Sequence, residues 1–378
     1  MARELTDLIS ELVAIDSVNP DLVPGGAGEI ELARFAVEWL ERAGLEVSLD
    51  EIAPGRANAV AVARGTGGGR SLLLNGHLDT VGVSGMERPF EPYVADGRLY
   101  GRGAYDMKAS LAAMMVTVAR ARELGLRGDL IVSAVADEEV ASIGSEAVAR
   151  AWHPDAVIVT EPTELAVAVA HRGFVWLDIE TTGRAAHGSR PELGIDAIAK
   201  MGHVLVGLEE LDRTLRATPT HRLLGSGSLH ASLIEGGREL STYPDRCLLQ
   251  VERRTIPGET PDSVAAEVRA VVAHAAARDP ELRVDVRVTF VREPFEVAEE
   301  EAIVQAITTA ARTALASEPE PIGVPFWTDA GVFAAAGLPT VLFGPAGEGA
   351  HAAVEWVDLE SVERLADALL AVAEDFCG

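Results

Sequence analysis

Several side chains that can bind metal or transfer protons come directly after short apolar runs in the sequence. In SLLLNGHLDTV (residues 71–81), three leucines lead to His77 and Asp79. Residues two positions apart lie on the same side of an extended chain, so Asp79 can accept the N–H of a neighbouring imidazole and orient it. Metal-binding histidines are held in this way, although an ordinary loop histidine would fit the same pattern.

Other apolar runs also end in acids or in a histidine. They are Leu130–Val135 before Asp137, Glu138 and Glu139; Ala156–Val159 before Glu161; and Pro339–Phe343 before a glycine-rich loop and His351. Adjacent acids near a core repel one another unless a cation neutralises them, and a solvated loop is the alternative interpretation. Asp106 opens an apolar helical pattern, where the alternative to a metal ligand is a helix N-cap.

Taken together, these segments supply two histidines and at least three carboxylates, with no thiolate among them. Imidazole nitrogen and carboxylate oxygen suit zinc, cobalt or manganese. Five ligands exceed what one tetrahedral catalytic ion needs, and they suit two ions about 3.5–4 Å apart that share one carboxylate. The sequence therefore predicts a centre with two divalent metal ions.

The elements that must position these residues alternate between strand-like and helix-like patterns. The helical patterns in this part of the chain are Leu5–Val13, Ile30–Leu40, Met107–Glu123 and Ser142–Arg150. Alternation of this kind predicts an α/β fold, with a mostly parallel sheet sandwiched by helices. Because such sheets bind ligands beyond the carboxyl ends of their strands, the candidate ligands are expected along one edge.

The middle of the chain shows a different order of elements, β-α-β-β-α-β. The segments are Phe174–Thr181, Ile195–Leu211, Leu229–Ile234, Arg246–Arg253, Pro261–Ala277 and Arg283–Val291. This order is typical of a ferredoxin-like α+β domain. We therefore expect an inserted domain at 175–291 between two parts of a catalytic domain, 1–174 and 292–378, with a helix near Ile303–Leu315.

The composition of the chain argues against some classes of binding partner. The 378 residues carry a net charge of −27, which argues against nucleic acid or an anionic membrane as a partner. The sequence contains no stretch of about 18 uncharged apolar residues, so we expect no membrane span. The start MARELTDLIS does not resemble a signal peptide, and the two cysteines, Cys247 and Cys377, suggest neither a metal pair nor a disulfide scaffold. We expect a cytoplasmic protein.

The segments GHLDT, GRGAYDMK, DEE, TEPT and GPAGEGAH, in this order, resemble the signature of the M20 metallopeptidase family. That family includes deacetylases, desuccinylases and carboxypeptidases. The resemblance implies one metal held by His77, Asp106 and Glu161, a second held by Glu139 and His351, and Asp106 as the bridge. It also implies that Glu138 is the general base, that Asp79 orients His77, and that the inserted domain is a lid and dimerisation domain.

Two further residues are implied by the same resemblance. TGRAAHGSRPELGIDAI resembles the segment whose histidine reaches the partner's active site, so His187 is expected to stabilise an oxyanion in trans. VERRTIPGET resembles the segment whose arginine binds the substrate carboxylate, which is Arg254. The chain departs from many relatives at Ser241, where they have asparagine, and at Val354, where they have asparagine or aspartate.

These observations predict a hydrolase with two metal ions, most simply zinc, that cleaves the amide bond of an N-acyl amino acid. The expected assembly is a homodimer through the inserted domain. A carboxypeptidase or dipeptidase on the same scaffold is the nearest alternative. A catalytically inactive binding protein and an acidic scaffold built to dimerise are alternatives of other classes.

Overall fold

A computed structural model describes residues 2–315 and 319–378, and the chain divides into two compact units. Unit 1 comprises Met1–Val169, Val297–Ile322 and Thr328–Gly378, and unit 2 comprises Ala170–Glu296 and Gly323–Trp327. Met1 and residues 316–318 fall inside the segments 1–174 and 292–378 expected to be catalytic, and they lie outside the described residues.

A large mixed sheet belongs mostly to unit 1, and its residues 170–171, 295–296 and 323–324 are among those of unit 2. Its order is β1-β2-β6-β3-β7-β15-β8-β13, with β14 beside β8. Its strands are β1 Glu46–Ala53, β2 Arg56–Ala63, β3 Leu72–His77, β6 Leu130–Val135, β7 Ala156–Val159, β8 Ala168–His171, β13 Phe295–Glu296, β14 Ile322–Val324 and β15 Thr340–Leu342. The strands β6, β3, β7 and β15 run parallel, as expected, whereas β1 and β2 add antiparallel pairings at one side.

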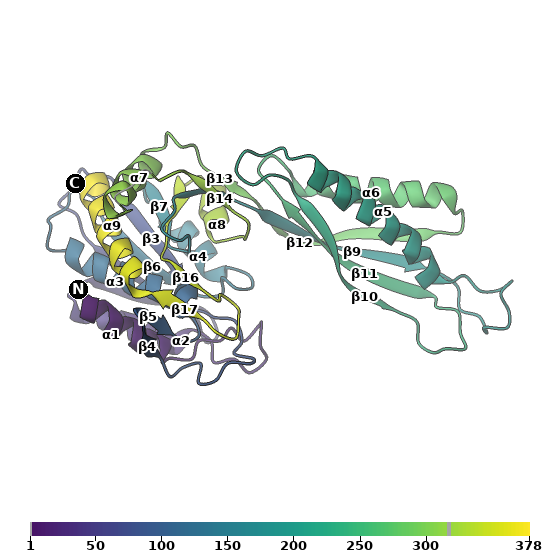
Figure 1. Ribbon diagram of the computed structural model, residues 1–378, viewed down its shortest axis with the longest axis horizontal. Coiled ribbons are helices and arrows are strands. Elements are labelled where there is room, and N and C mark those ends of the chain that lie inside the picture. The colour runs from purple at the N-terminus through teal and green to yellow at the C-terminus, as the bar shows by residue number, and fades with distance from the viewer. Residues whose placement is uncertain (1, 316–318) are drawn as a thin grey trace. The chain divides into compact units, whose positions relative to one another are not determined.

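Helices cover both faces of this sheet, which confirms the predicted sandwich (Figure 1). One layer contains α3 Ala109–Ala121, α7 Ala302–Leu315 and α9 Leu359–Cys377, and the other contains α4 Ile143–Ala151 and α8 Ala330–Ala335. The helix α1 Ala2–Val13 packs on α3 and α9, and α2 Ile30–Arg42 packs on β1 and β2. Strand β3 is buried along its whole length because both faces are covered.

A second, small antiparallel sheet has the order β16-β17-β5-β4. Its strands are β4 Tyr93–Ala95, β5 Arg98–Tyr100, β16 Gly347–Glu348 and β17 Trp356–Asp358. The five-residue turn η1, Ala104–Lys108, follows β5 and separates it from α3. Pairing of β17 with β5 therefore brings the loop around residue 351 next to the segment that contains residue 106.

Unit 2 has the predicted ferredoxin-like order of elements. They are β9 Gly173–Thr182, α5 Ala197–Ala217, β10 Ser228–Gly236, β11 Arg246–Thr255, α6 Pro261–Arg278 and β12 Arg283–Arg292. The antiparallel sheet has the order β10-β11-β9-β12, and α5 and α6 lie over one of its faces (Figure 1). Helix α6 begins with a capping box between Thr260 and Ser263.

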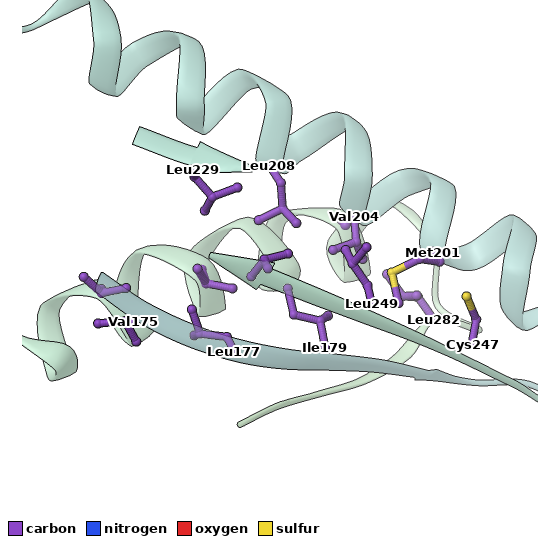
Figure 2. Packing of buried hydrophobic residues seen from close by; sticks show 14 of the residues in the cluster. Val175, Leu177, Ile179, Met201, Val204, Leu208, Leu229, Cys247, Leu249 and Leu282 are labelled. Carbon is purple, nitrogen blue, oxygen red and sulfur yellow. The ribbon is translucent and has the colours of Figure 1, made fainter. Parts of the chain in front are cut away.

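The core of unit 2 follows from the alternation read in the sequence. In β9 the odd positions Val175, Leu177 and Ile179 are buried, and they pack beneath Met201 and Leu208 of α5 (Figure 2). Burial of each such aliphatic side chain contributes about 1.5–3 kcal/mol to folding. The opposite face of β9 carries Trp176, Asp178 and Glu180, as a sheet covered on one side requires.

In the described part of the chain, no helix combines the length and the apolar composition that crossing a bilayer would need.

Candidate metal centre

The parallel strands of unit 1 place three of the candidate ligands along one edge of the sheet. His77 is the last residue of β3, Glu139 comes four residues after the end of β6, and Glu161 comes two residues after the end of β7. Because β6, β3 and β7 are adjacent and parallel, their carboxyl ends meet at this edge. The strand order thus explains how residues more than eighty positions apart become neighbours.

Segments next to the small sheet supply the remaining two candidate ligands. Asp106 lies in the η1 turn, where its backbone is non-helical, and its side chain does not cap α3. His351 lies in the loop between β16 and β17, with a positive φ of 61°. Gly349 in the same loop has φ 91°, and a Cβ there would meet the Val354 carbonyl, so glycine is required.

The carboxylate of Asp106 lies between the two imidazoles. Its Oδ1 is 3.0 Å from Nε2 of His77, and its Oδ2 is 3.4 Å from Nε2 of His351. Nε2 of His77 is also 3.8 Å from Oε1 of Glu161, and Nε2 of His351 is 3.1 Å from Oε2 of Glu139. The five side chains therefore converge on a common point, with Asp106 shared between two groups.

Glu138 belongs to the same cluster. Its carboxylate, the Glu161 carboxylate and the His77 ring offer ligand atoms that lie within 4.8 Å of one another. A second such group combines His77, Asp106 and Glu139. Glu138 is close enough to contact either an ion or a water molecule held beside it, so its position fits the base implied by the resemblance and also fits a ligand.

The electrostatics of the cluster indicate that positive charge is needed there. Burial raises the pKa of Glu138 and Glu161 well above the ordinary value, and neighbouring acids raise both further. Burial also raises the pKa of Glu139. Hydrogen bonds to Asp106 and Glu139 raise the pKa of His351 to about 10. Carboxylates and imidazoles gathered in this way are the donor set that divalent zinc, cobalt or manganese prefers.

The contact between Asp79 and His77 differs from the expected one. Nδ1 of His77 lies 2.9 Å from the main-chain oxygen of Asp79, whereas its distance to the Asp79 carboxylate is 3.7 Å. Donation to this carbonyl leaves the Nε2 lone pair directed at the cluster. The Asp79 carboxylate instead accepts the backbone N–H groups of Glu138 and Glu139, both at 3.1 Å.

Glu355 supports the backbone of the candidate site, a role that was not predicted from the sequence. Its buried carboxylate accepts a hydrogen bond from Arg102 at 2.6 Å. It also accepts the backbone N–H groups of Gly103, Tyr105 and Asp106, between 2.9 and 3.1 Å. Glu355 therefore fixes the backbone that presents Asp106, and its signal in the sequence was an acid close after His351.

Asp137, the first acid of DEE, does not join the metal cluster. Its Oδ1 accepts a hydrogen bond from Arg56 at 2.7 Å and another from Asn19 at 3.0 Å. Arg56 also pairs with the buried Glu29 through two contacts of 2.6 Å. The three acids predicted as one cluster thus divide, with Asp137 directed to a buried arginine and Glu138 and Glu139 directed to the candidate ligands.

His187 and Arg254 belong to unit 2. His187 is exposed, and its Nδ1 accepts the backbone N–H of Ser189 at 3.2 Å, which leaves the proton on Nε2. Nε of Arg254 donates to Glu252 at 2.6 Å, and its guanidinium lies 5.1 Å from the centre of the Phe174 ring. Arg253, its neighbour, is fully buried against Glu259 and Glu267 and so has a structural role.

The two departures from the family pattern lie at accessible positions. The main-chain oxygen of Ser241 accepts the N–H of Gly188, next to His187. Val354 is 64% exposed and lines a cavity of about 440 Å³ in unit 1, together with Met86, Tyr93 and Tyr100. Neither Ser241 nor Val354 belongs to the candidate metal groups.

Comparison with known families decides the class of the protein. The model of the peptidase family M20/M25/M40 matches residues 73–375, a range that contains all of the candidate ligands. The chain belongs to this family. It is accordingly a metal-binding hydrolase of the M20 type, which acts on amide or peptide bonds.

Named relatives are similar along the whole chain. An acetylornithine deacetylase of Myxococcus xanthus is 29% identical over 391 residues, covering 98% of this chain and 97% of the relative. An N-formyl-4-amino-5-aminomethyl-2-methylpyrimidine deformylase of Halalkalibacterium halodurans is 28% identical, covering 99% and 95%.

Solved structures share the fold. The aminopeptidase PepT of Bacillus cereus has a TM-score of 0.82 at 20% identity, covering 100% of this chain and 99% of that one. A dinuclear metal-binding peptidase of the M20 family from Bacillus subtilis has a TM-score of 0.76 at 16% identity, covering 100% and 98%.

Proposed function

We propose that this protein is an amidohydrolase with two metal ions that removes the acyl group from an N-acyl amino acid or a similar small amide. The observation that carries the proposal is the Asp106 carboxylate, whose two oxygens face His77 and His351 separately. A carboxylate placed in this way can serve two ions at once. The names of the relatives, a deacetylase and a deformylase, support an acyl group as the part removed.

Each ion would be held by a distinct set of side chains. His77, Asp106 and Glu161 would hold one, and Asp106, Glu139 and His351 would hold the other. When bound, the two cations, most simply zinc with cobalt or manganese as alternatives, supply the positive charge that acidifies a water molecule and polarises the scissile carbonyl. The same charge would offset the repulsion among the buried acids.

Glu138 would carry the proton during hydrolysis. Its pKa is raised by burial and by Glu161, a direction that favours a carboxyl able to gain and return a proton near neutral pH. The Glu138 carboxylate would accept the proton of the attacking water and deliver it to the leaving amine. The mechanism requires no covalent intermediate.

The unit 2 residues would act on the substrate. Arg254 would pair with the free carboxylate of the substrate, for which a guanidinium is suited. His187 would donate its Nε2 proton to the oxyanion that forms at the scissile carbonyl, in agreement with the tautomer that Ser189 selects. We propose further that the chain forms a homodimer through unit 2 and that His187 serves the partner's site.

A cytoplasmic location is also proposed. Both cysteines, Cys247 and Cys377, are buried and free of disulfides, which fits a reducing compartment.

A substrate screen with added metal tests the function. The purified protein, stripped of metal and then supplied with zinc, cobalt or manganese, is assayed on N-acetyl, N-succinyl and N-formyl amino acids and on dipeptides. Release of a free amine from acylated amino acids supports the proposal, whereas turnover of dipeptides alone assigns a peptidase. Absence of turnover with all three metals, although metal binds, would identify an inactive binding protein and contradict the proposal.

A further inference from the structure

Asn19 lies in a buried position behind the metal centre, outside the motifs that carry the family resemblance. It is fully buried, and its main-chain N–H donates to the Thr80 carbonyl at 2.9 Å. Thr80 follows Asp79 directly, so the loop around Asn19 is attached to the segment that leaves β3.

Both the oxygen and the nitrogen of the Asn19 side-chain amide form hydrogen bonds. Its Oδ1 accepts the backbone N–H of Asp21 at 2.9 Å. Its Nδ2 donates to Oδ2 of Asp79 at 2.8 Å and to Oδ1 of Asp137 at 3.0 Å. The bond from Asp21 fixes which end of the amide carries the nitrogen, so the two donated protons face two carboxylates.

The Asp79 carboxylate and the main chain of Asp137 hold the turn that contains the acid pair. The two oxygens of Asp79 accept the backbone N–H groups of Glu138 and Glu139 separately. Asp137 has φ 72°, a left-handed conformation that is strained for a residue with a side chain. Its main-chain oxygen accepts the N–H groups of Val140, Ala141 and Ser142, and this closes the turn.

We propose that Asn19 is a positioning residue for the reaction, acting through Asp79 and Asp137 on the carboxylates of Glu138 and Glu139. A neutral double donor is suited to this place, because it joins two buried carboxylates without adding a charge. Arg56 supplies the positive charge of the network by donating to the same oxygen of Asp137, Oδ1, at 2.7 Å. The inference rests on the proposed function in assigning Glu138 to proton transfer and Glu139 to a metal ion.

The test compares Asn19→Ala, Asn19→Ser and a control, Asn75→Ala. Asn75 is also fully buried in unit 1, but its amide donates to the hydroxyls of Ser133 and Ser145. Serine at position 19 retains an acceptor for the Asp21 N–H and one donor, so it should fold where alanine fails. Folding is checked by thermal unfolding of the metal-free chains.

Two readouts are measured on each folded chain. Zinc binding is followed by calorimetry on the metal-free protein, and kcat and KM are measured on the substrate found in the screen. Loss of a residue that orients a metal ligand weakens metal affinity or activity by about 10–100-fold. We expect such a loss in Asn19→Ala, in one zinc-binding step and in kcat with KM nearly unchanged, and a smaller loss in Asn19→Ser.

The outcomes separate the inference from the proposed function. If both Asn19 variants bind zinc and turn over as the unmodified chain does, or if they lose no more than Asn75→Ala, the inference is overturned. If no chain hydrolyses any amide, the proposed function fails, and the zinc-binding comparison still decides the role of Asn19. Cobalt-loaded chains add a spectroscopic readout, because a displaced Glu139 would alter the visible absorption of the metal.

Discussion

At the scale of single residues, the proposed mechanism gives different roles to two adjacent acids, Glu138 and Glu139. Glu138 and Glu139 share the backbone support of Asp79, yet Glu139 lies against His351 whereas Glu138 lies with His77 and Glu161. Adjacent residues of a turn point in different directions, so one acid can bind a metal ion while the other handles protons.

The substitution Glu138→Gln separates these two roles. Glutamine retains the shape of the side chain but cannot accept the proton, and a general base contributes about 10²–10⁴-fold to the rate. We expect kcat to fall by about this factor while zinc calorimetry still shows both binding steps. Loss of a zinc ion from Glu138→Gln would instead make Glu138 a metal ligand and would exclude it as the base.

Metal binding should release protons. The pKa of His351 is raised to about 10 by Asp106 and Glu139, so without metal the ring carries a proton throughout pH 6–8 and must lose it to bind an ion. Lower pH favours the protonated ring, so the apparent zinc affinity should decrease as pH falls, about tenfold per pH unit for each proton released. Calorimetry in two buffers of different ionisation enthalpy counts the protons, and equal affinity at pH 6 and pH 8 would refute this prediction.

The sequence pointed to the candidate ligands of this centre, but it did not point to the residues that support them. Apolar strands precede His77, Glu161 and the acid pair, and the end of such a strand can be recognised from the sequence alone. The contacts of Asn19, Arg56 and Glu355 join segments distant in the chain and leave no local periodic pattern. The Asp79 carboxylate was expected beside His77, but two free N–H groups of the following turn compete for it and bind it instead.

At the scale of elements, irregular segments present the candidate side chains, and short buried parallel strands fix the positions of these segments. The flanking helices were predictable because their hydrophobic patterns are long, and the parallel strands because each contains a continuous apolar run. The strands β16 and β17, of two and three residues, are too short to show alternation. The predicted helix from Met107 begins later, at Ala109, because Met107 is non-helical and part of the turn that presents Asp106.

Removing Arg102 from its buried pair with Glu355 tests whether the turn η1 needs this support to present Asp106. The substitution Arg102→Ala leaves the Glu355 carboxylate buried without its cation, which costs about 3–5 kcal/mol of unfolding free energy. We expect a loss of that size in urea unfolding, together with weaker zinc binding because Asp106 loses its support. Arg88→Ala, which removes an exposed pair with Glu91, is the matched control and should cost about 0–1 kcal/mol. Equal effects of the two substitutions would contradict the role assigned to Glu355.

At the scale of the whole molecule, unit 2 offers a surface for assembly. In the described chain β10 pairs with β11 alone, and its residues Leu233 and Ile234 are 66% and 55% exposed. An unpaired strand edge with apolar side chains readily pairs with another chain. This supports a dimer through unit 2, which the resemblance had implied.

Charge on this edge should prevent assembly. We expect the double substitution Leu233→Lys and Ile234→Lys to give particles of about 39.9 kDa by light scattering, against twice that mass for the unmodified chain. Val94→Lys, at a 50% exposed position of β4 in unit 1, is the control and should remain dimeric. A monomeric unmodified chain, or a dimeric double variant, would show that β10 is not the interface.

The central claim is that two cations lie on either side of Asp106, and anomalous diffraction from zinc-loaded crystals tests it most directly. We expect two anomalous peaks about 3.5–4 Å apart, one beside His77 and Glu161 and the other beside Glu139 and His351. A single peak, or two peaks that do not share the Asp106 carboxylate, would contradict it.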